Sequence, residues 1–256
     1  SATMLRKSDR NMSGPRFCAV IPTYNNARPL LDVVVRTHRQ LPDIIVVNDG
    51  STDATAACLA SSPVPVTVVA LARNRGKGYA LREGFRKARA CGFTHAVTID
   101  ADGQHYPEDI PALVAASRRN PAALIVGSRP FDHENMPRGN TFANRFSNFW
   151  FRLQTGINLP DTQTGLRIYP LSGIRGERWL TARYEAELEL LVASAWAGVP
   201  LCPVTVRVSY PEDRVTHFRP VMDFVRISLL NTVLCLLAAV YDKKEPVNEI
   251  KTEETK

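Results

Sequence analysis

The chain has 256 residues, of which 45% are hydrophobic and 22% charged, so it can bury a full core as one domain with an appendage. Its formal net charge of +7 suits an anionic partner, such as a nucleotide diphosphate, a phospholipid or a nucleic acid, without distinguishing among them. Its 5 cysteines are odd in number and widely spaced, with no Cys-x-x-Cys pair. This pattern argues against a disulfide framework and a zinc site, and favours a reducing cytosol.

Residues 1–16 are polar and basic without an apolar core, so we expect a flexible segment and no signal peptide. After them, short runs of apolar or β-branched residues predict strands buried on both faces: Phe17–Ile21, Ile44–Val47, Val66–Leu71, His95–Ile99 and Ala123–Val126. Helical stretches alternate with these strands: Pro29–Gln40, Ala54–Ser61, Gly78–Ala90 and Pro107–Arg119. The alternation predicts an α/β domain over residues 17–220, with a mostly parallel, Rossmann-like sheet flanked by helices.

A C-terminal helix that is apolar or amphipathic is predicted over residues 221–242. Its unbroken apolar stretch is shorter than the ~20 residues that a membrane-spanning helix needs. Two arrangements stay open: a helix packed on the domain, and one lying in a membrane interface with Lys243 and Lys244 near anionic headgroups. The tail over residues 243–256 is charged and predicted to be disordered.

The most informative motif follows the predicted strand that ends at Ile99, and reads Asp100-Ala101-Asp102-Gly103-Gln104-His105. Because alternate residues of an extended segment point the same way, Asp100, Asp102 and Gln104 could bind one Mg²⁺ or Mn²⁺ ion, which could hold a diphosphate. A solvated Asp-Gly turn is the simpler alternative. An EF-hand loop does not fit, because its sixth and twelfth positions hold His and Pro. A phosphatase with an Asp nucleophile would place such a motif nearer the start of its fold.

Two further loops follow predicted strands. Asn48-Asp49-Gly50-Ser51-Thr52-Asp53 contains a helix N-cap, Ser51 or Thr52, and leaves Asp49 to bind a nucleotide base or ribose. The first strand ends beside it in Pro22-Thr23-Tyr24-Asn25. Asn74-Arg75-Gly76-Lys77-Gly78 is a basic, glycine-bracketed loop at a helix start, suited to phosphate, although its glycines match neither common phosphate-binding fingerprint.

These loops, taken in order, closely resemble family 2 glycosyltransferases of the GT-A fold, particularly dolichyl-phosphate mannose synthase and the polyprenyl-phosphate glycosyltransferases. The resemblance runs from about Phe17 to about Asp223. It continues through four further motifs: Gly127-Ser128-Arg129, Arg138-Gly139-Asn140, Asp161-Thr162-Gln163-Thr164-Gly165-Leu166-Arg167 and Arg214-Val215-Thr216-His217-Phe218.

The resemblance implies a role for each matching residue. The donor nucleotide sugar would be held by seven residues: Pro22, Tyr24, Asn25, Asp49, Lys77, Asp100 and Ala101. The metal ion, Mg²⁺ or Mn²⁺, would be bound by Asp100, Asp102 and Gln104. The acceptor would lie near Arg129, Arg138, Asn140 and Gln163, and the catalytic residues would be Asp161 and Asp102. For Glu185 and Glu187, a role as charges at a helix N-terminus is favoured over catalysis.

The function that the resemblance implies is inverting transfer of one sugar from GDP-mannose or a UDP-hexose to a lipid-linked phosphate such as polyprenyl phosphate. The partners would be the nucleotide sugar and the lipid phosphate, with peripheral contact at the cytoplasmic membrane face, no nucleic acid and an open oligomeric state. A hydroxyl acceptor, with Asp161 as general base, is the alternative. It stays open because Thr164-Gly165-Leu166 and Thr216-His217-Phe218 replace the Ser-Gly-Phe and Ser-His-Phe of the polyprenyl branch. A phosphatase and a catalytically silent binding module are further alternatives.

Overall fold

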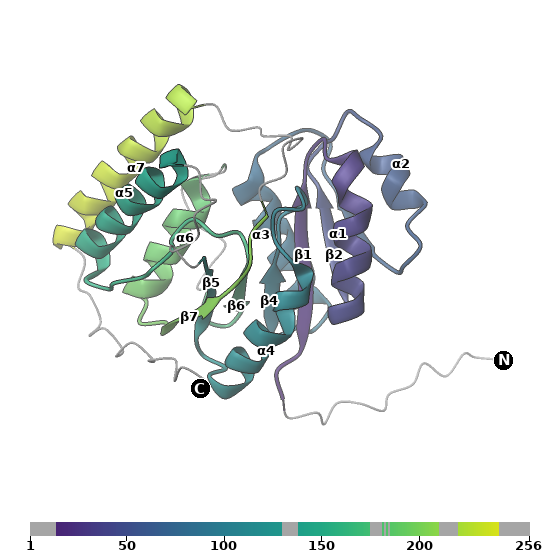
Figure 1. Cartoon of the computed structure of the whole chain (residues 1–256), viewed down its shortest axis with the longest axis horizontal. Helices are drawn as coiled ribbons and strands as arrows, with labels where there is room; N and C mark the ends of the chain where they lie inside the picture. The colour runs from purple at the N-terminus through teal and green to yellow at the C-terminus, as the bar shows by residue number, and fades with distance from the viewer. Residues whose placement is uncertain are drawn as a thin grey trace.

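A computed structural model describes residues 14–129, 138–174, 181, 183, 185–209 and 220–240; the side chains of 138–143, 220–226 and 239–240 are outside this description. Its centre is a seven-stranded sheet in the order β3-β2-β1-β4-β6-β5-β7 (Figure 1). β6 pairs antiparallel with β4 and β5, and the other pairs are parallel. The strands span Phe17–Thr23 (β1), Ile44–Asn48 (β2), Thr67–Ala70 (β3), His95–Thr98 (β4), Leu124–Ser128 (β5), Arg167–Pro170 (β6) and Leu201–Thr205 (β7).

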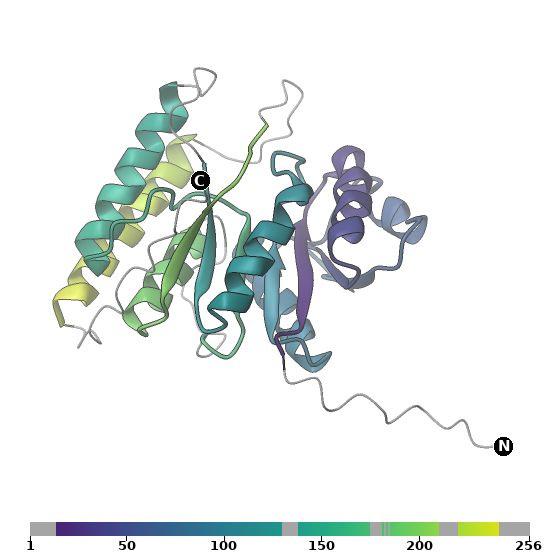
Figure 2. The ribbon, with the colours of Figure 1, turned by 60° about the horizontal axis from the view of Figure 1, so that its bottom comes forward.

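Helices cover both faces of the sheet (Figure 2). Successive side chains of a strand point to opposite faces, so in β1 Val20 joins one core layer and Ala19 joins the other. The first layer contains side chains of α3, α5, α6 and α7, and the second contains side chains of α1, α2 and α4. The helices span Ala27–Gln40 (α1), Thr55–Ala60 (α2), Lys77–Ala90 (α3), Ile110–Arg119 (α4), Arg138–Thr155 (α5), Glu185–Trp196 (α6) and Pro220–Val240 (α7), with a 3₁₀ turn at Pro107–Asp109 (η1).

The predicted α/β fold with a mostly parallel sheet is confirmed, and the five predicted strands and four predicted helices are present. The prediction that every strand is buried on both faces is wrong for β3. This strand lies at the sheet edge, where it has one neighbour, and Val68 is 42% exposed. Strands β6 and β7, which complete the sheet beyond β4, were not predicted from the sequence.

Helix α3 packs against β1 and β2, with a close approach at Gly84, and Lys77 is its first residue. A Cβ added to Gly84 would lie 2.4 Å from Cγ1 of Val20 and 3.2 Å from Cγ2 of Val47. Glycine is therefore required for this close approach, which sets the position of the α3 N-terminus relative to the carboxyl ends of β1 and β2.

The C-terminal helix α7 lies where the sequence predicts a helix and packs on α5 and α6, burying Leu230 and Leu234. Its prediction as an apolar helix is not supported, because a polar side chain is buried along it while a leucine is exposed. Asn231 is only 1% exposed and accepts a hydrogen bond from Gln154, while Leu236 is 67% exposed. In the part of the chain that the structure describes, no helix combines the length and the apolar character needed to cross a bilayer.

Candidate active site

Parallel pairing of β1, β2 and β4 brings the loops after these strands to one edge of the sheet. The loop after β1 contains Asn25 in the left-handed region, with φ of 52°. Its backbone N–H donates to Ser51 Oγ (3.0 Å), and its Oδ1 accepts from the Thr52 N–H (2.8 Å). The loops after β1 and β2, predicted to hold a nucleotide, are thus joined directly to each other.

Asp49 holds the basic loop that precedes α3. It is 2% exposed, and its two carboxylate oxygens accept hydrogen bonds from the backbone N–H groups of Arg75 and Gly76, both at 2.8 Å. Burial raises the pKa of Asp49, and these two hydrogen bonds oppose the rise. The carboxylate therefore uses two N–H groups that a phosphate would otherwise meet at this loop. A donor-binding role for Asp49 stays a prediction.

Lys77 lies between two carboxylates from distant parts of the chain. Its Nζ is 2.6 Å from Oδ1 of Asp100 and 2.6 Å from Oε2 of Glu187, the latter in the first turn of α6. Burial lowers the pKa of Lys77, but the two carboxylates outweigh it and hold that pKa above its ordinary value. The charges of Lys77 and others nearby likewise keep the pKa of Asp100 below its ordinary value despite burial.

Glu187 is a site residue that the sequence patterns did not indicate. A charge at a helix N-terminus was the favoured interpretation, and nothing in the sequence connects it with Lys77, which precedes it by 110 positions. The same helix end is fixed by Arg167, whose buried guanidinium donates to the Glu187 carbonyl (2.9 Å) and to the Thr162 carbonyl (2.9 Å). Arg167 therefore links α6 to the loop that carries Asp161.

Asp102 forms no ion pair with any of the described residues. Burial and then the charge of Asp100 raise its pKa to about 6, while the Gln104 N–H donates to Oδ1 at 3.0 Å. Among the described residues, no three His, Cys, Asp or Glu side chains gather as a metal site. Two adjacent carboxylates nevertheless fit a Mg²⁺-like ion, which is held by one or two carboxylates and completes its shell with substrate phosphates and water.

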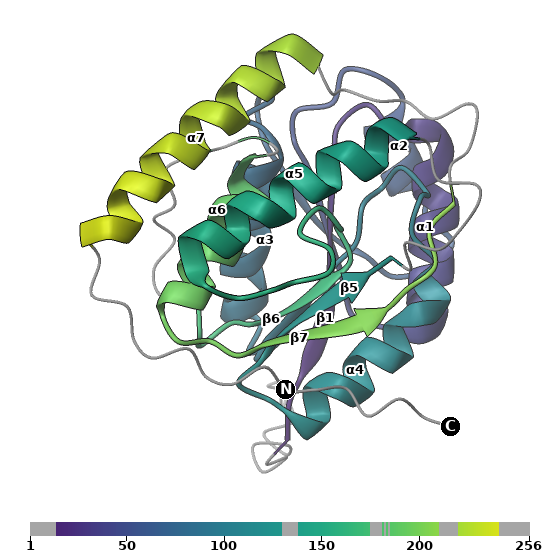
Figure 3. The same ribbon diagram turned by 60° about the vertical axis from the view of Figure 1, so that its left-hand side comes forward.

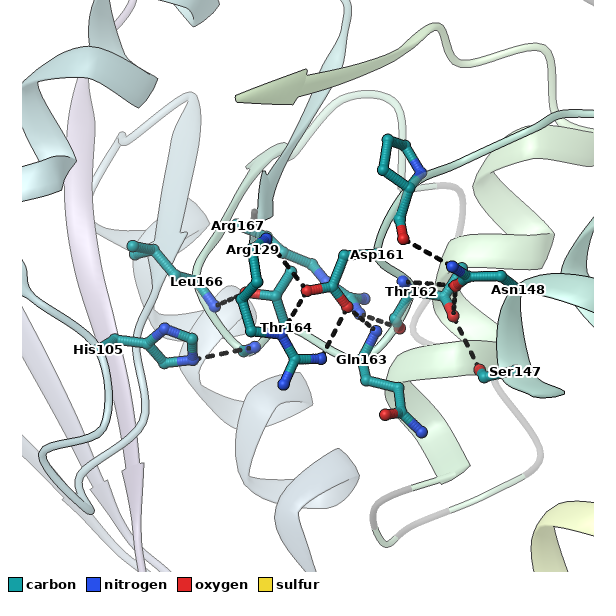
Figure 4. A network of polar contacts seen from close by, with 12 residues as sticks. His105, Arg129, Ser147, Asn148, Asp161, Thr162, Gln163, Thr164, Leu166 and Arg167 are labelled. Carbon is teal, nitrogen blue, oxygen red and sulfur yellow. Dashed lines mark hydrogen bonds and ion pairs between the residues drawn. The ribbon is translucent and has the colours of Figure 1, made fainter. Parts of the chain in front are cut away.

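On the other side of the site, Arg129 and Asp161 form a buried, two-pronged ion pair (Figure 4). The guanidinium donates from Nε to Oδ2 (2.5 Å) and from Nη2 to Oδ1 (2.9 Å), and Asp161 is fully buried. Asp161 Oδ1 also accepts from the Gln163 N–H at 2.9 Å. This two-pronged geometry is the strongest form of the arginine–carboxylate pair.

The two halves of the site meet at Gly165. Its N–H donates to Nε2 of His105 (3.3 Å), and its carbonyl accepts from the Thr98 hydroxyl (2.9 Å). Figure 4 shows His105 pointing toward the loop that also carries Asp161. Burial lowers the pKa of His105 to about 4, so its ring is neutral near pH 7. His105 therefore ties the loop with Asp100 and Asp102 to the loop with Asp161, a role that its place in the motif did not reveal.

The structure locates four more of the predicted site residues, and their roles stay predictions. Pro22 pairs with Val47 in the sheet, and Ala101 is buried in the loop after β4. Arg138 and Asn140 lie in the first turn of α5, with side chains outside the described set. The motif over 214–218 lies outside the described residues.

A model of glycosyl transferase family 2 matches residues 18–175, the part of the chain that contains these loops. The chain belongs to this family. A relative in Methanococcus voltae, a UDP-N-acetylglucosamine–dolichyl-phosphate N-acetylglucosaminyltransferase, is 29% identical over 79% of this chain and 89% of its own length. The undecaprenyl-phosphate mannosyltransferase of Micrococcus luteus is 33% identical over 62% of this chain and 68% of its own length.

Solved structures agree on the fold of this family 2 glycosyltransferase. Glucosyl-3-phosphoglycerate synthase from Mycobacterium tuberculosis, solved with Mn²⁺, UDP-glucose and phosphoglyceric acid, aligns with a TM-score of 0.64 at 20% identity. The alignment covers 90% of this chain and 82% of that one. Mannosyl-3-phosphoglycerate synthase from Rubrobacter xylanophilus aligns with a TM-score of 0.64 at 17% identity, over 94% of this chain and 79% of its own. The predicted GT-A fold is confirmed.

Proposed function

We propose that this family 2 glycosyltransferase moves one sugar from a nucleotide-diphosphate sugar to a lipid-linked phosphate such as polyprenyl phosphate. Support comes from relatives whose names specify dolichyl phosphate and undecaprenyl phosphate as acceptors. The donor is proposed by class only, as GDP-mannose or a UDP-hexose. A polyprenyl phosphate is a membrane lipid, so we propose that the reaction takes place at a membrane surface, on the cytoplasmic face that the family resemblance implies.

The observation that carries the acceptor proposal is the set of hydrogen bonds that Asp161 accepts. A hydroxyl acceptor must lose its proton to a positioned base, whereas a phosphate monoester is already anionic near neutral pH. Asp161 is the matching candidate for that base, yet both of its oxygens accept hydrogen bonds from Arg129 or Gln163. Asp161 is also fully buried, and hydrogen-bond donors already occupy the oxygens that would have to reach the proton of an acceptor hydroxyl. This arrangement favours the phosphate acceptor.

On the donor side, Asp100, Asp102 and Gln104 would hold the divalent ion, Mg²⁺ or Mn²⁺. When bound, that ion would neutralise charge on the departing diphosphate. Lys77 supplies a fixed positive charge beside Asp100, and therefore near the same phosphates. Asp102 fits the ligand role because, unlike Asp100, it forms no ion pair with any described residue.

We also propose inversion at the anomeric carbon, which the family resemblance implies and with which the arrangement of the two halves is compatible. The proposed donor loops meet the loop that carries Asp161 and Gly165, here called the acceptor loop, so a sugar between them would face the leaving diphosphate on one side and the acceptor on the other. Within the acceptor half, Arg138 would bind the acceptor phosphate. Arg129, held in place by its ion pair with Asp161, would orient that phosphate.

The first test is a thermal-shift panel of nucleotide sugars with and without Mn²⁺, because a ligand that binds only the native state raises the melting temperature. Transfer is then measured with a short-chain polyprenyl phosphate and with hydroxyl acceptors. We expect transfer to the phosphate, its loss in Arg138→Ala, and a modest effect of Asp161→Asn on turnover once unfolding is controlled. Turnover with hydroxyl acceptors alone, together with collapse in Asp161→Asn, would contradict the proposal and favour the hydroxyl alternative.

Two controls address the remaining alternatives. Phosphate release from small phosphoesters without a sugar nucleotide would indicate the phosphatase, which the family match already disfavours. Binding of a nucleotide sugar with no hydrolysis or transfer under any metal condition would indicate the catalytically silent module.

A further inference from the structure

Two neighbouring helices of one layer expose large apolar side chains. On α5 these are Phe149 (60% exposed) and Leu153 (57%), one turn apart. On α7 they are Leu229 (65%), Leu236 (67%) and Leu237 (42%), spaced so that they share one side of the helix. We call these five residues the α5–α7 apolar face. Figure 3 shows the two helices side by side.

The exposed side of α5 is also cationic. Two exposed arginines border the apolar face. Arg145 lies four residues before Phe149, and Arg152 lies one residue before Leu153. The helix contains no Asp or Glu over its whole length, Arg138–Thr155. Within the described part of the chain, neither Arg145 nor Arg152 forms an ion pair. A helix surface with apolar and basic residues and no acids is typical of interfacial membrane-binding helices.

We propose that the α5–α7 apolar face docks on an anionic bilayer surface, with the apolar side chains at the headgroup boundary and Arg145 and Arg152 on lipid phosphates. Long arginine side chains can reach the headgroups while the neighbouring apolar groups enter the boundary. A second copy of the chain fits this face less well. A symmetric contact would bring the arginines of both copies together, with no acid on α5 to compensate them.

The docking face is connected to the acceptor loop by hydrogen bonds on the inner side of α5. Thr162, next to Asp161, donates its hydroxyl proton to Asn148 Oδ1 and shares a second hydrogen bond with the Ser147 hydroxyl, both at 2.8 Å. Asn148 Nδ2 in turn donates to the Pro160 carbonyl (2.6 Å). A membrane seated on the outer side of α5 would therefore hold the acceptor loop near the headgroups, where a lipid phosphate lies. This step rests on the proposed lipid-phosphate acceptor.

The test measures binding of the full chain to vesicles by flotation. One set of vesicles contains equal parts phosphatidylglycerol and phosphatidylcholine, and the other contains phosphatidylcholine alone. We expect binding to the anionic set, with Arg145→Gln/Arg152→Gln lowering the partition coefficient about fivefold per arginine. Phe149→Gln/Leu153→Gln should lower it about tenfold or more. Removal of α7 is not used, because it would take Leu230 and Leu234 out of the core layer and expose the parts of α5 and α6 that α7 covers.

Matched controls change exposed residues elsewhere. Val68→Gln removes an exposed apolar side chain from the edge strand β3, and Arg39→Gln/Arg119→Gln removes two charges from α1 and α4. These variants should bind vesicles like the unchanged chain. Thermal melting of every variant confirms that it is folded.

Two acceptors separate this inference from the proposed function: a short-chain polyprenyl phosphate dispersed in water, and a long-chain one embedded in anionic vesicles. Phe149→Gln/Leu153→Gln should keep transfer to the first and lose transfer to the second. Vesicle binding without transfer to either would contradict the proposed function and support the docking face. Absence of vesicle binding, or equal binding by all variants, would overturn the docking face. So would a dimer, seen by sedimentation, that Phe149→Gln/Leu153→Gln dissociates.

Discussion

The backbone of Gly165 lies directly against the carboxylate of Asp100: a Cβ added to Gly165 would lie 2.3 Å from Oδ2 of Asp100. Gly165 belongs to the loop that carries Asp161, and Asp100 belongs to the loop after β4. The contact therefore explains why a glycine is needed here, since any side chain would displace the carboxylate that pairs with Lys77.

Gly165→Ala should disturb the site more than the fold. The nearest atoms belong to a side-chain end, which can rotate, so we expect a loss of roughly 1–3 kcal/mol in stability. The displaced Asp100 should weaken Mn²⁺-dependent binding of the nucleotide sugar, measured as a smaller thermal shift. Gly14→Ala is the control, because a Cβ there would meet nothing within 4 Å. A normal thermal shift in Gly165→Ala would contradict the role given to this contact.

Asp102→Asn should reduce turnover by orders of magnitude while the protein stays folded. The substitution keeps the shape of the side chain and removes the charge that a divalent ion would neutralise. It also removes a carboxylate whose pKa burial and Asp100 raise, so the folded state should lose no stability. Transfer is measured with Mn²⁺ present, and melting without ligand. Near-native turnover would show that Asp102 is not a metal ligand.

Lys77→Met should destabilise the protein strongly, by roughly 3–5 kcal/mol, because Asp100 and Glu187 would be left as partly buried charges without a partner. Lys77→Met/Glu187→Gln should recover part of this loss, since one of the two unpaired charges is then absent. Urea unfolding of the single and double variants measures the difference. A double variant less stable than Lys77→Met would show that Glu187 is not held there by its charge.

Arg129 and Asp161 should be strongly coupled in a double-mutant cycle. Asp161→Asn leaves a guanidinium that is 13% exposed without its anion, so we expect a loss of roughly 3 kcal/mol in the free energy of unfolding. Arg129→Gln/Asp161→Asn should lose clearly less than the sum of the single losses. Additive losses would indicate that the two side chains do not depend on each other in solution.

A pH prediction concerns the pair of Arg36 and Glu108, which joins α1 to η1. The Arg36 guanidinium donates to both Glu108 oxygens (2.9 and 2.7 Å) and lowers the pKa of Glu108 to about 2, from 4.5. Because the pKa of Glu108 is lower in the folded chain, its charged form stabilises the fold above pH 4.5. This contribution disappears as the pH falls toward 2. Because Glu108 is 40% exposed, the contribution should be below about 1 kcal/mol. Glu108→Gln should therefore differ from the unchanged chain in urea midpoint at neutral pH, and converge with it in acid.

The sequence by itself determined the first half of the sheet and which loops follow its strands. Apolar runs of strand length mark β1, β2 and β4, because strands buried on both faces need apolar side chains at successive positions. Parallel strands place their carboxyl ends at one edge of a sheet. The order of strands and motifs along the chain is therefore enough to assign the loops with Asp49 and Asp100 to one site.

Tertiary structure alone decided which partner each of these side chains has. Asp49 binds the backbone of the loop before α3, Lys77 lies between Asp100 and Glu187, and Asp161 is held by Arg129. These contacts join residues that are far apart along the chain, such as Asp49 and Arg75, which are separated by 26 positions, and a local pattern carries no information about such pairings. The charged residues can be read from the sequence, but the packing of α3, α5 and α6 on the sheet determines which charges pair and which remain available to a ligand.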